Sequence, residues 1–295
     1  MVNKRVAGGA LRGKNIVVTG GSTGIGYEIV REALRCGANI LFCARNTDKI
    51  KTALDLLAAE GFGPLRVQGR VADVSDSSAV YALFEAAEGL YGQVNGLVNA
   101  AAIMGPIGPV VDLDPVEWLE AIQVDLFGTF LVAREASKRM VSVGNGGRIV
   151  LFSGGGASGP FPNYSAYACS KVAVVRFTET LAQELGPHGI EVNCLAPGFV
   201  ATKIHEATLR AGATAGKEYL QRTKDELAKG GASPTYAARA ATFLLSDAAR
   251  GISGKFIAAV HDGWERWPEH LEEIRSTDIF TLRRILPGER GMDWQ

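Results

Sequence analysis

The sequence of 295 residues lacks the marks of several protein classes. Its four Cys form no Cys-x-x-Cys pair and its four His show no ligand spacing, so neither a disulfide framework nor a metal site is predicted. Lys and Arg total 31, as do Asp and Glu, and no basic block occurs, which argues against nucleic-acid binding. No run of about 20 apolar residues could span a membrane, and no signal peptide is recognisable near the start. We therefore expect a cytoplasmic protein.

Glycine, in contrast, is in excess. The chain has 36 Gly, about 12% of its residues, against a usual share of about 7%. The 11 Pro show no matching excess and no Gly-x-y period occurs, so the surplus is neither collagen-like nor a linker. With 47% hydrophobic residues the chain can bury a large core. The glycines must therefore serve particular backbone geometries within a folded domain.

Short β-branched runs alternate with amphipathic helical stretches along most of the chain. The predicted strands are 15–19, 39–43, 65–71, 96–99, 147–152, 191–196 and 255–260. The predicted helices are 25–36, 48–59, 75–90, 115–143, 166–186 and 234–245. This order predicts an α/β fold of the Rossmann type, a doubly wound seven-stranded parallel sheet with helices on both faces. Such sheets bind ligands beyond the carboxyl ends of their strands.

Two segments depart from the alternation. Residues 202–231 contain helical pieces without a strand, which predicts a lid over a substrate cleft. Residues 264–295 follow the last strand and carry three of the four Trp. We expect this C-terminal extension to pack on the same or a neighbouring subunit, while residues 1–263 form one domain.

A glycine-rich loop follows the first predicted strand and opens a helix. It reads Thr-Gly-Gly-Ser-Thr-Gly-Ile-Gly over residues 19–26. Gly20, Gly24 and Gly26 allow a tight turn, a close approach to a pyrophosphate and the packing of helix against strand, while the helix N-terminus offers free N–H groups. The loop therefore predicts a dinucleotide-binding and catalytic domain over residues 1–263.

Together with this loop, later motifs make the chain resemble the short-chain dehydrogenase/reductase family, in its single-domain branch and its 3-oxoacyl-carrier-protein reductase-like members. They are Asp73, the run Asn-Ala-Ala-Ala at 99–102, Tyr-Ala-Cys-Ser-Lys at 167–171 and Asn-Cys-Leu-Ala-Pro-Gly at 193–198. The resemblance covers residues 14–263 and implies a homo-oligomer, a dimer or a tetramer. The cofactor-binding residues it implies are Gly20, Ser22, Thr23, Gly24, Ile25, Gly26, Asp73, Val74, Asn99, Ala100, Ala101, Tyr167, Lys171, Pro197, Gly198, Val200 and Thr202.

The end of the second predicted strand bears on the choice between NAD(H) and NADP(H). An acidic residue there would bind the ribose 2′-hydroxyl and repel a 2′-phosphate. The chain instead reads Phe-Cys-Ala-Arg-Asn over residues 42–46, and the guanidinium of Arg45 can pair with a phosphate. NADP(H) is therefore favoured, the alternative being that Arg45 is an ordinary surface residue.

Tyr167 and Lys171 are the predicted catalytic pair. Four residues apart on a helix, both point from one face into the same space. A neighbouring ammonium stabilises a phenolate and lowers its pKa, so Tyr167 can serve as acid and base for a ketone or secondary alcohol. The resemblance adds that Lys171 holds the nicotinamide ribose.

Two positions depart from the family pattern. The Ser expected thirteen residues before the tyrosine, where it would donate a hydrogen bond to the substrate carbonyl, is Gly154. Ser153, a backbone N–H of this glycine loop, Ser158 or Ser165 could replace it, or the contact is missing. Asp125 stands where the family has an Asn in a proton relay. It could support that relay with altered pH dependence, or bind local backbone.

These features predict an NADP-dependent reductase acting on a small molecule. The residues expected to face the nicotinamide are uncharged, which favours a neutral carbonyl compound: Ile103, Met104, Pro106, Phe161 and Phe199. A ring-bearing sugar or polyketide is a further candidate substrate, because Trp264 and Trp267 could stack on a ring. The alternative for these two Trp is packing in an interface. The alternatives are a nucleotide-binding regulator that lost its chemistry, and an epimerase or dehydratase with a transient hydride step.

Overall fold

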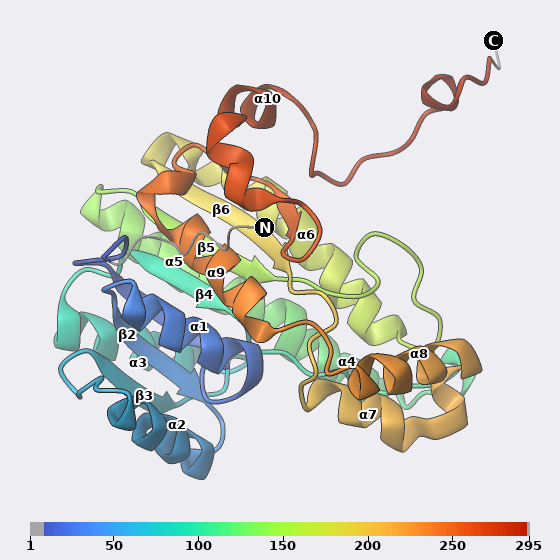
Figure 1. Ribbon diagram of the computed structural model, residues 1–295, viewed down its shortest axis with the longest axis horizontal. Helices are drawn as coiled ribbons and strands as arrows, with labels where there is room; N and C mark the ends of the chain where they lie inside the picture. Colours follow the sequence, from blue (N-terminus) through green and yellow to red (C-terminus); the bar gives the residue numbers. More distant parts are fainter. Residues whose placement is uncertain (1–8, 294–295) are drawn as a thin grey trace.

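The computed structural model describes residues 9–293, within which seven parallel strands form one sheet in the order β3-β2-β1-β4-β5-β6-β7 (Figure 1). The first eight residues, where no signal peptide was expected, and Trp294 of the extension lie outside the described residues. The strands are β1 (Asn15–Thr19), β2 (Asn39–Ala44), β3 (Val67–Val71), β4 (Gly96–Asn99), β5 (Gly147–Phe152), β6 (Ile190–Ala196) and β7 (Phe256–Ala258). This is the predicted doubly wound sheet, and its order reverses between β1 and β4.

Helices cover both faces of the sheet. The α-helices of the described residues are α1 (Gly24–Arg35), α2 (Thr47–Ala59), α3 (Ser77–Tyr91), α4 (Pro115–Ile122), α5 (Gly128–Val143), α6 (Ser165–Leu185), α7 (Ile204–Ala211), α8 (Lys217–Ala228), α9 (Pro234–Leu245) and α10 (Leu271–Ser276), of which α7 and α8 lie in the segment 202–231 and α10 in the C-terminal extension. Alternate side chains of each strand point to opposite faces, so Ile16 and Val18 join a core with α1, α2 and α9, whereas Val17 joins a second core with α3, α5 and α6. Because both faces of the sheet are buried, the strands consist almost entirely of apolar residues.

One predicted helix is interrupted. The stretch 115–143 is divided into α4 and α5 by a π-helical turn, Gln123–Phe127, and Asp125 lies in the middle of that turn. Single π turns inside α-helices occur frequently at functional sites because they change where a side chain points. Here the Asp125 side chain is completely buried.

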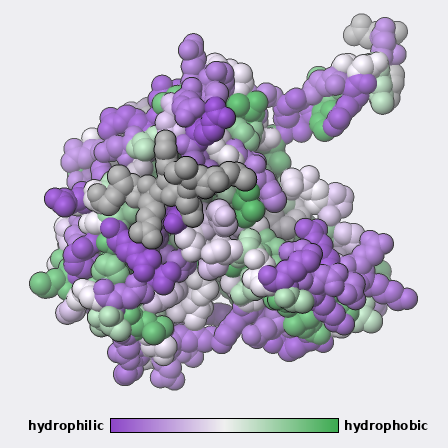
Figure 2. Space-filling view, in the orientation of Figure 1, coloured by the Kyte–Doolittle hydropathy of each residue, from purple (hydrophilic) through white to green (hydrophobic). Residues whose placement is uncertain are grey.

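Residues 202–231 pack on the body of the protein through a small apolar cluster. Tyr164 is fully buried there, its ring stacks on Phe161 at 4.2 Å, and Tyr219 of α8 meets both rings edge-on. The Tyr164 hydroxyl also donates a hydrogen bond to Oγ1 of Thr208 in α7, at 3.0 Å. The helices are therefore anchored by aromatic packing, and the surface of this region is mainly hydrophilic (Figure 2).

The C-terminal extension begins by packing against the core and then runs away from the body (Figure 1). Trp264 and Trp267 are buried. The ring centroid of Trp264 lies 5.3 Å from that of Phe243, and the ring centroid of Trp267 lies 4.5 Å from that of Phe280. The suggestion that these Trp stack on a substrate ring is wrong, because their rings are enclosed by the core. Within residues 9–293 no helix combines the length and the apolar character that crossing a membrane requires.

Candidate active site

A cavity of about 1950 Å³ lies at the carboxyl ends of the strands. This exceeds the range of roughly 300–1,000 Å³ common for one small ligand, so it offers room for a dinucleotide and a substrate together. Among the described residues, the cavity is lined by all the predicted cofactor-binding residues except Asn99, and by Ser153, Tyr167 and Lys171 of the predicted catalytic set. The sequence motifs, far apart along the chain, are thus brought to one place.

The glycine-rich loop forms a cradle that only glycine permits at two positions. Gly20 has φ +66°, and a Cβ on it would lie 2.9 Å from the backbone nitrogen of Ala101. A Cβ on Gly26 would lie 2.2 Å from the carbonyl oxygen of Gly20. Thr23, which precedes α1, makes no side-chain cap with any described residue, so it leaves the first N–H groups of the helix to a ligand. The loop therefore fits the pyrophosphate of a dinucleotide.

Asn99 has a different place from the one predicted. Its buried side chain accepts a hydrogen bond from Thr19 Oγ1 at 2.5 Å and donates one to Thr129 Oγ1 at 2.8 Å. Thr19 Oγ1 in turn accepts a hydrogen bond from the Ala101 N–H at 3.3 Å. Asn99 therefore ties β1 and β4 to α5 beneath the cavity, and positions Ala101 rather than lining the cavity itself.

The end of the cavity beside β2 carries two cations. Nη1 of Arg45, just after β2, lies 3.9 Å from Oδ2 of Asp73, while the other carboxylate oxygen of Asp73 accepts hydrogen bonds from Ser75. Lys49 also lines the cavity, in the first turn of α2, whose N-terminus is capped by Asn46. Sequence reasoning missed Lys49, although its place at the start of the helix that follows Arg45 was a signal.

Asp125, Lys171 and Tyr167 form a buried charged group. Asp125 Oδ1 accepts the N–H of Ile103 at 2.8 Å, and Oδ2 lies 3.2 Å from Nζ of Lys171. Lys171 is 2% exposed, and its Nζ lies 5.2 Å from the ring centre of Tyr167. Asp125 thus binds local backbone, which is one of the two alternatives for this residue, and it also pairs with the lysine. Its part in a proton relay stays a prediction.

The surroundings of Tyr167 act on its pKa in opposing directions. Burial raises the pKa of Tyr167, the ammonium of Lys171 lowers it, and the carboxylate of Asp125 raises it again, with a raised pKa as the net result. Burial lowers the pKa of Lys171, but the negative charge of Asp125 more than offsets this. Burial also raises the pKa of Asp125, against the opposing effect of Lys171. The expected depression by Lys171 exists but is outweighed.

Neither Ser153 nor Ser165 takes the place expected beside the Tyr167 phenol, whereas Ser158 lines the cavity and stays a candidate. Ser153 Oγ donates to the carbonyl oxygen of Lys171 at 2.9 Å, and Ser165, whose Oγ accepts from Trp118 Nε1 at 3.0 Å, is not among the lining residues in the described chain. A Cβ on Gly154 would lie 2.5 Å from the Tyr167 hydroxyl oxygen. The phenol therefore occupies the space that a side chain at position 154 would need, and the Ser153 hydroxyl is committed to the backbone of α6.

The substrate end combines the predicted apolar residues with residues of α7 and α8. Met104, Phe161 and Phe199 line the cavity as predicted, whereas Pro106 is not among its lining residues in the described chain. The residues expected to face the nicotinamide are uncharged, and the lid segment adds charged side chains to the same cavity. They are Lys203, Glu206, Arg210, Lys217, Glu218 and Arg222.

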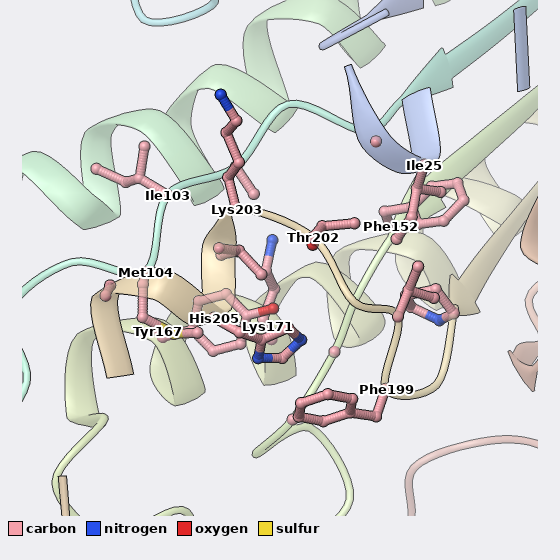
Figure 3. A pocket seen from close by; sticks show the side chains of 18 of the residues that line it. Ile25, Ile103, Met104, Phe152, Tyr167, Lys171, Phe199, Thr202, Lys203 and His205 are labelled. Atoms are coloured by element: carbon pink, nitrogen blue, oxygen red, sulfur yellow. The ribbon is translucent and has the colours of Figure 1, made fainter. Parts of the chain in front are cut away.

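His205 of α7 is a further lining residue, and no spacing of residues along the chain signals its role. Its ring stacks on Phe199 with centroids 3.9 Å and planes 18° apart. Figure 3 shows His205, Tyr167 and Lys171 gathered at one end of the cavity. Burial lowers the pKa of His205, and the backbone of Val200 offsets part of this, so the imidazole is neutral near pH 7.

Comparison with known proteins gives consistent results. The model of the short chain dehydrogenase family matches residues 14–211. A short chain dehydrogenase/reductase of Aspergillus oryzae, astE, is 34% identical over 251 residues, covering 84% of this chain and 94% of the relative. The structure of an actinorhodin polyketide ketoreductase with NADPH superposes with a TM-score of 0.76 at 29% identity, over 83% of this chain and 95% of the other. An NAD⁺-bound xylitol dehydrogenase shares the fold, with a TM-score of 0.76 at 24% identity, covering 84% and 98%.

Proposed function

The chain belongs to the short-chain dehydrogenase family of oxidoreductases, and on this premise we propose that it reduces a ketone to a secondary alcohol with NADP(H), using Tyr167 as the acid. The observation that carries the proposal is the convergence of the glycine cradle, Lys171 and Tyr167 on one cavity. When bound, the nicotinamide supplies the hydride. Tyr167 then donates a proton to the oxygen, and Lys171 orders the ribose and moderates the phenol's acidity.

Arg45 and Lys49 support NADP(H) as the nucleotide. Both cations line the cavity where the ribose 2′-phosphate would lie, and the end of β2 carries no carboxylate. Asp73 lies within 3.9 Å of Arg45, but its carboxylate is held by Ser75 and serves the adenine in this proposal. Solved relatives are bound to NADPH in one case and to NAD⁺ in another, so the proposal depends on these side chains.

The wall of the substrate end supports a ring-bearing carbonyl compound. The ring centroid of Phe161 lies 6.5 Å from that of Tyr167 and 4.7 Å from that of Tyr219, and both pairs are edge-on. Phe199 and His205 present a second pair of stacked rings. Aromatic surfaces of this kind favour a flat or cyclic substrate, because stacked and edge-on contacts stabilise rings beyond simple burial.

A two-step experiment tests the proposal. NADPH binding is measured by fluorescence, and a panel of cyclic and aromatic ketones is then assayed for NADPH consumption by the wild type and Tyr167→Phe. We expect binding by both proteins, with turnover by the wild type alone, reduced at least about 1,000-fold by the substitution. Tight binding without turnover of any ketone would favour the alternative, a nucleotide-binding regulator, which Gly154 and the engaged Ser153 hydroxyl also suggest.

A further inference from the structure

The described structure leaves the substrate carbonyl without the hydroxyl donor that the sequence pattern leads one to expect. Position 154 has no side chain, and Ser153 Oγ points to the Lys171 carbonyl. A donor beside the acid matters because negative charge develops on the carbonyl oxygen as the hydride arrives, and a prearranged N–H or O–H stabilises that charge. A different side chain in the same part of the cavity could provide it.

His205 has the properties of such a donor. The residue is only 9% exposed, yet its ring lines the cavity. Its Nδ1 is buried and makes no hydrogen bond to any described residue. The stack on Phe199 fixes the plane of the imidazole before a ligand binds. Nε2 is not among the buried unpaired atoms, and no hydrogen bond within the described residues engages it, so this nitrogen of a neutral imidazole is available to a ligand in the cavity.

We propose that His205 donates a hydrogen bond from Nε2 to the carbonyl oxygen of the substrate, in the role that the missing Ser would have had. The inference rests on the proposed function and deepens it by naming the residue that polarises the carbonyl. We assign the proton to Nε2 because a buried N–H without a partner is rarer, and more costly, than a buried acceptor without one. Nδ1, enclosed by protein, is then the unprotonated nitrogen.

The reaction remains balanced with His205 in this role. One hydride is added to the carbonyl carbon, one proton passes from the Tyr167 hydroxyl to the oxygen, and the C=O double bond becomes a C–O single bond. His205 keeps its proton throughout, since it stabilises the oxygen by a hydrogen bond alone. Removing the N–H should therefore affect kcat more than KM, because the charge on oxygen is largest in the transition state.

Three substitutions distinguish the effect of the N–H donor from the effect of the aromatic ring. His205→Phe keeps a ring against Phe199 but has no donor. His205→Gln keeps a donor near the position of Nε2, and His205→Met has similar length without one. His188→Gln, at an exposed position beyond α6, serves as the matched control. The probe is 9,10-phenanthrenequinone, a flat ring-bearing dione, assayed by NADPH consumption, with thermal melting and NADPH affinity measured for every variant.

We expect kcat of His205→Phe and His205→Met to fall roughly 100-fold, with KM changed less than about tenfold. His205→Gln should retain kcat within about tenfold of the wild type, and His188→Gln should match it. NADPH affinity should be unchanged in all four. If Phe or Met at position 205 leaves kcat within threefold of the wild type, His205 is not the donor, although the protein is a reductase. If the wild type binds NADPH but reduces neither the probe nor any ketone of the panel, the proposed function fails, and this inference fails with it.

Discussion

Asp125→Asn tests how the buried carboxylate controls the acidity of the catalytic tyrosine. Oδ2 of Asp125 lies 3.2 Å from Nζ of Lys171, and that nitrogen lies 5.2 Å from the ring centre of Tyr167. One side of a triangle cannot exceed the sum of the other two, so the carboxylate is within about 8 Å of the phenol ring. At an effective dielectric constant of about 20, two unit charges at this distance repel by about 2 kcal/mol.

Asparagine keeps the size of the side chain and an oxygen for the Ile103 N–H, but it removes the charge. Because Asp125 raises the pKa of Tyr167, its neutralisation should move that pKa downward. An interaction of about 2 kcal/mol corresponds to a roughly thirty-fold larger ionisation constant. Lys171 loses its partner at the same time, so the variant is first checked for folding by circular dichroism.

The titration of Tyr167 is followed by the ultraviolet absorbance of phenolate. Each protein is compared with the same protein carrying Tyr167→Phe, so that the signals of the other tyrosines cancel. Asp55→Asn serves as the control, since it removes an exposed carboxylate that pairs with Lys51 at 2.8 Å in α2. A Tyr167 pKa that stays unchanged in Asp125→Asn, or that rises, would refute the electrostatic coupling argued here.

Two further predictions concern the nucleotide site. Arg45→Asp should weaken NADPH binding roughly ten- to hundred-fold and leave NADH affinity nearly unchanged, because only the 2′-phosphate loses a charged partner. Equal losses of affinity for both nucleotides in fluorescence titrations would show that Arg45 does not bind the 2′-phosphate. Gly26→Ala should lower both the free energy of unfolding, by roughly 1–3 kcal/mol, and NADPH affinity, since its Cβ would lie 2.2 Å from the Gly20 carbonyl oxygen. Gly89→Ala, in an open exposed position of α3, is the control, and urea unfolding should show it as stable as the wild type or more stable.

The sheet could be predicted from sequence because its signals are local. β1, β4 and β5 have the predicted bounds, since β-branched residues between glycine-rich turns specify buried parallel strands. The π turn between α4 and α5 could not be predicted, because the apolar residues of the stretch 115–143 recur with the α-helical period from end to end. Its place is tied to tertiary contacts, namely those that Asp125 makes with Ile103 and Lys171.

The site was predictable where a motif fixes backbone geometry, and less so where a side chain's direction depends on neighbours distant in sequence. The glycines of the loop after β1 belong to the first kind. Asn99 belongs to the second, since Thr19 and Thr129 draw its side chain beneath the cavity. His205 does too, since α7, which carries it, is tied to the body by the hydrogen bond between Tyr164 and Thr208.

Gly154 and Asp125 together bear on the direction of the proposed reaction. A phenol whose pKa is raised stays protonated at neutral pH, and is therefore ready to donate a proton to a carbonyl oxygen but poorly suited to remove one from an alcohol. The missing side chain at position 154 lets the Tyr167 hydroxyl occupy the space where a Ser would have stood. The raised pKa to which Asp125 contributes thus fits the proposed carbonyl reduction, while the missing side chain at position 154 leaves the carbonyl in need of a donor such as His205 in the same part of the cavity.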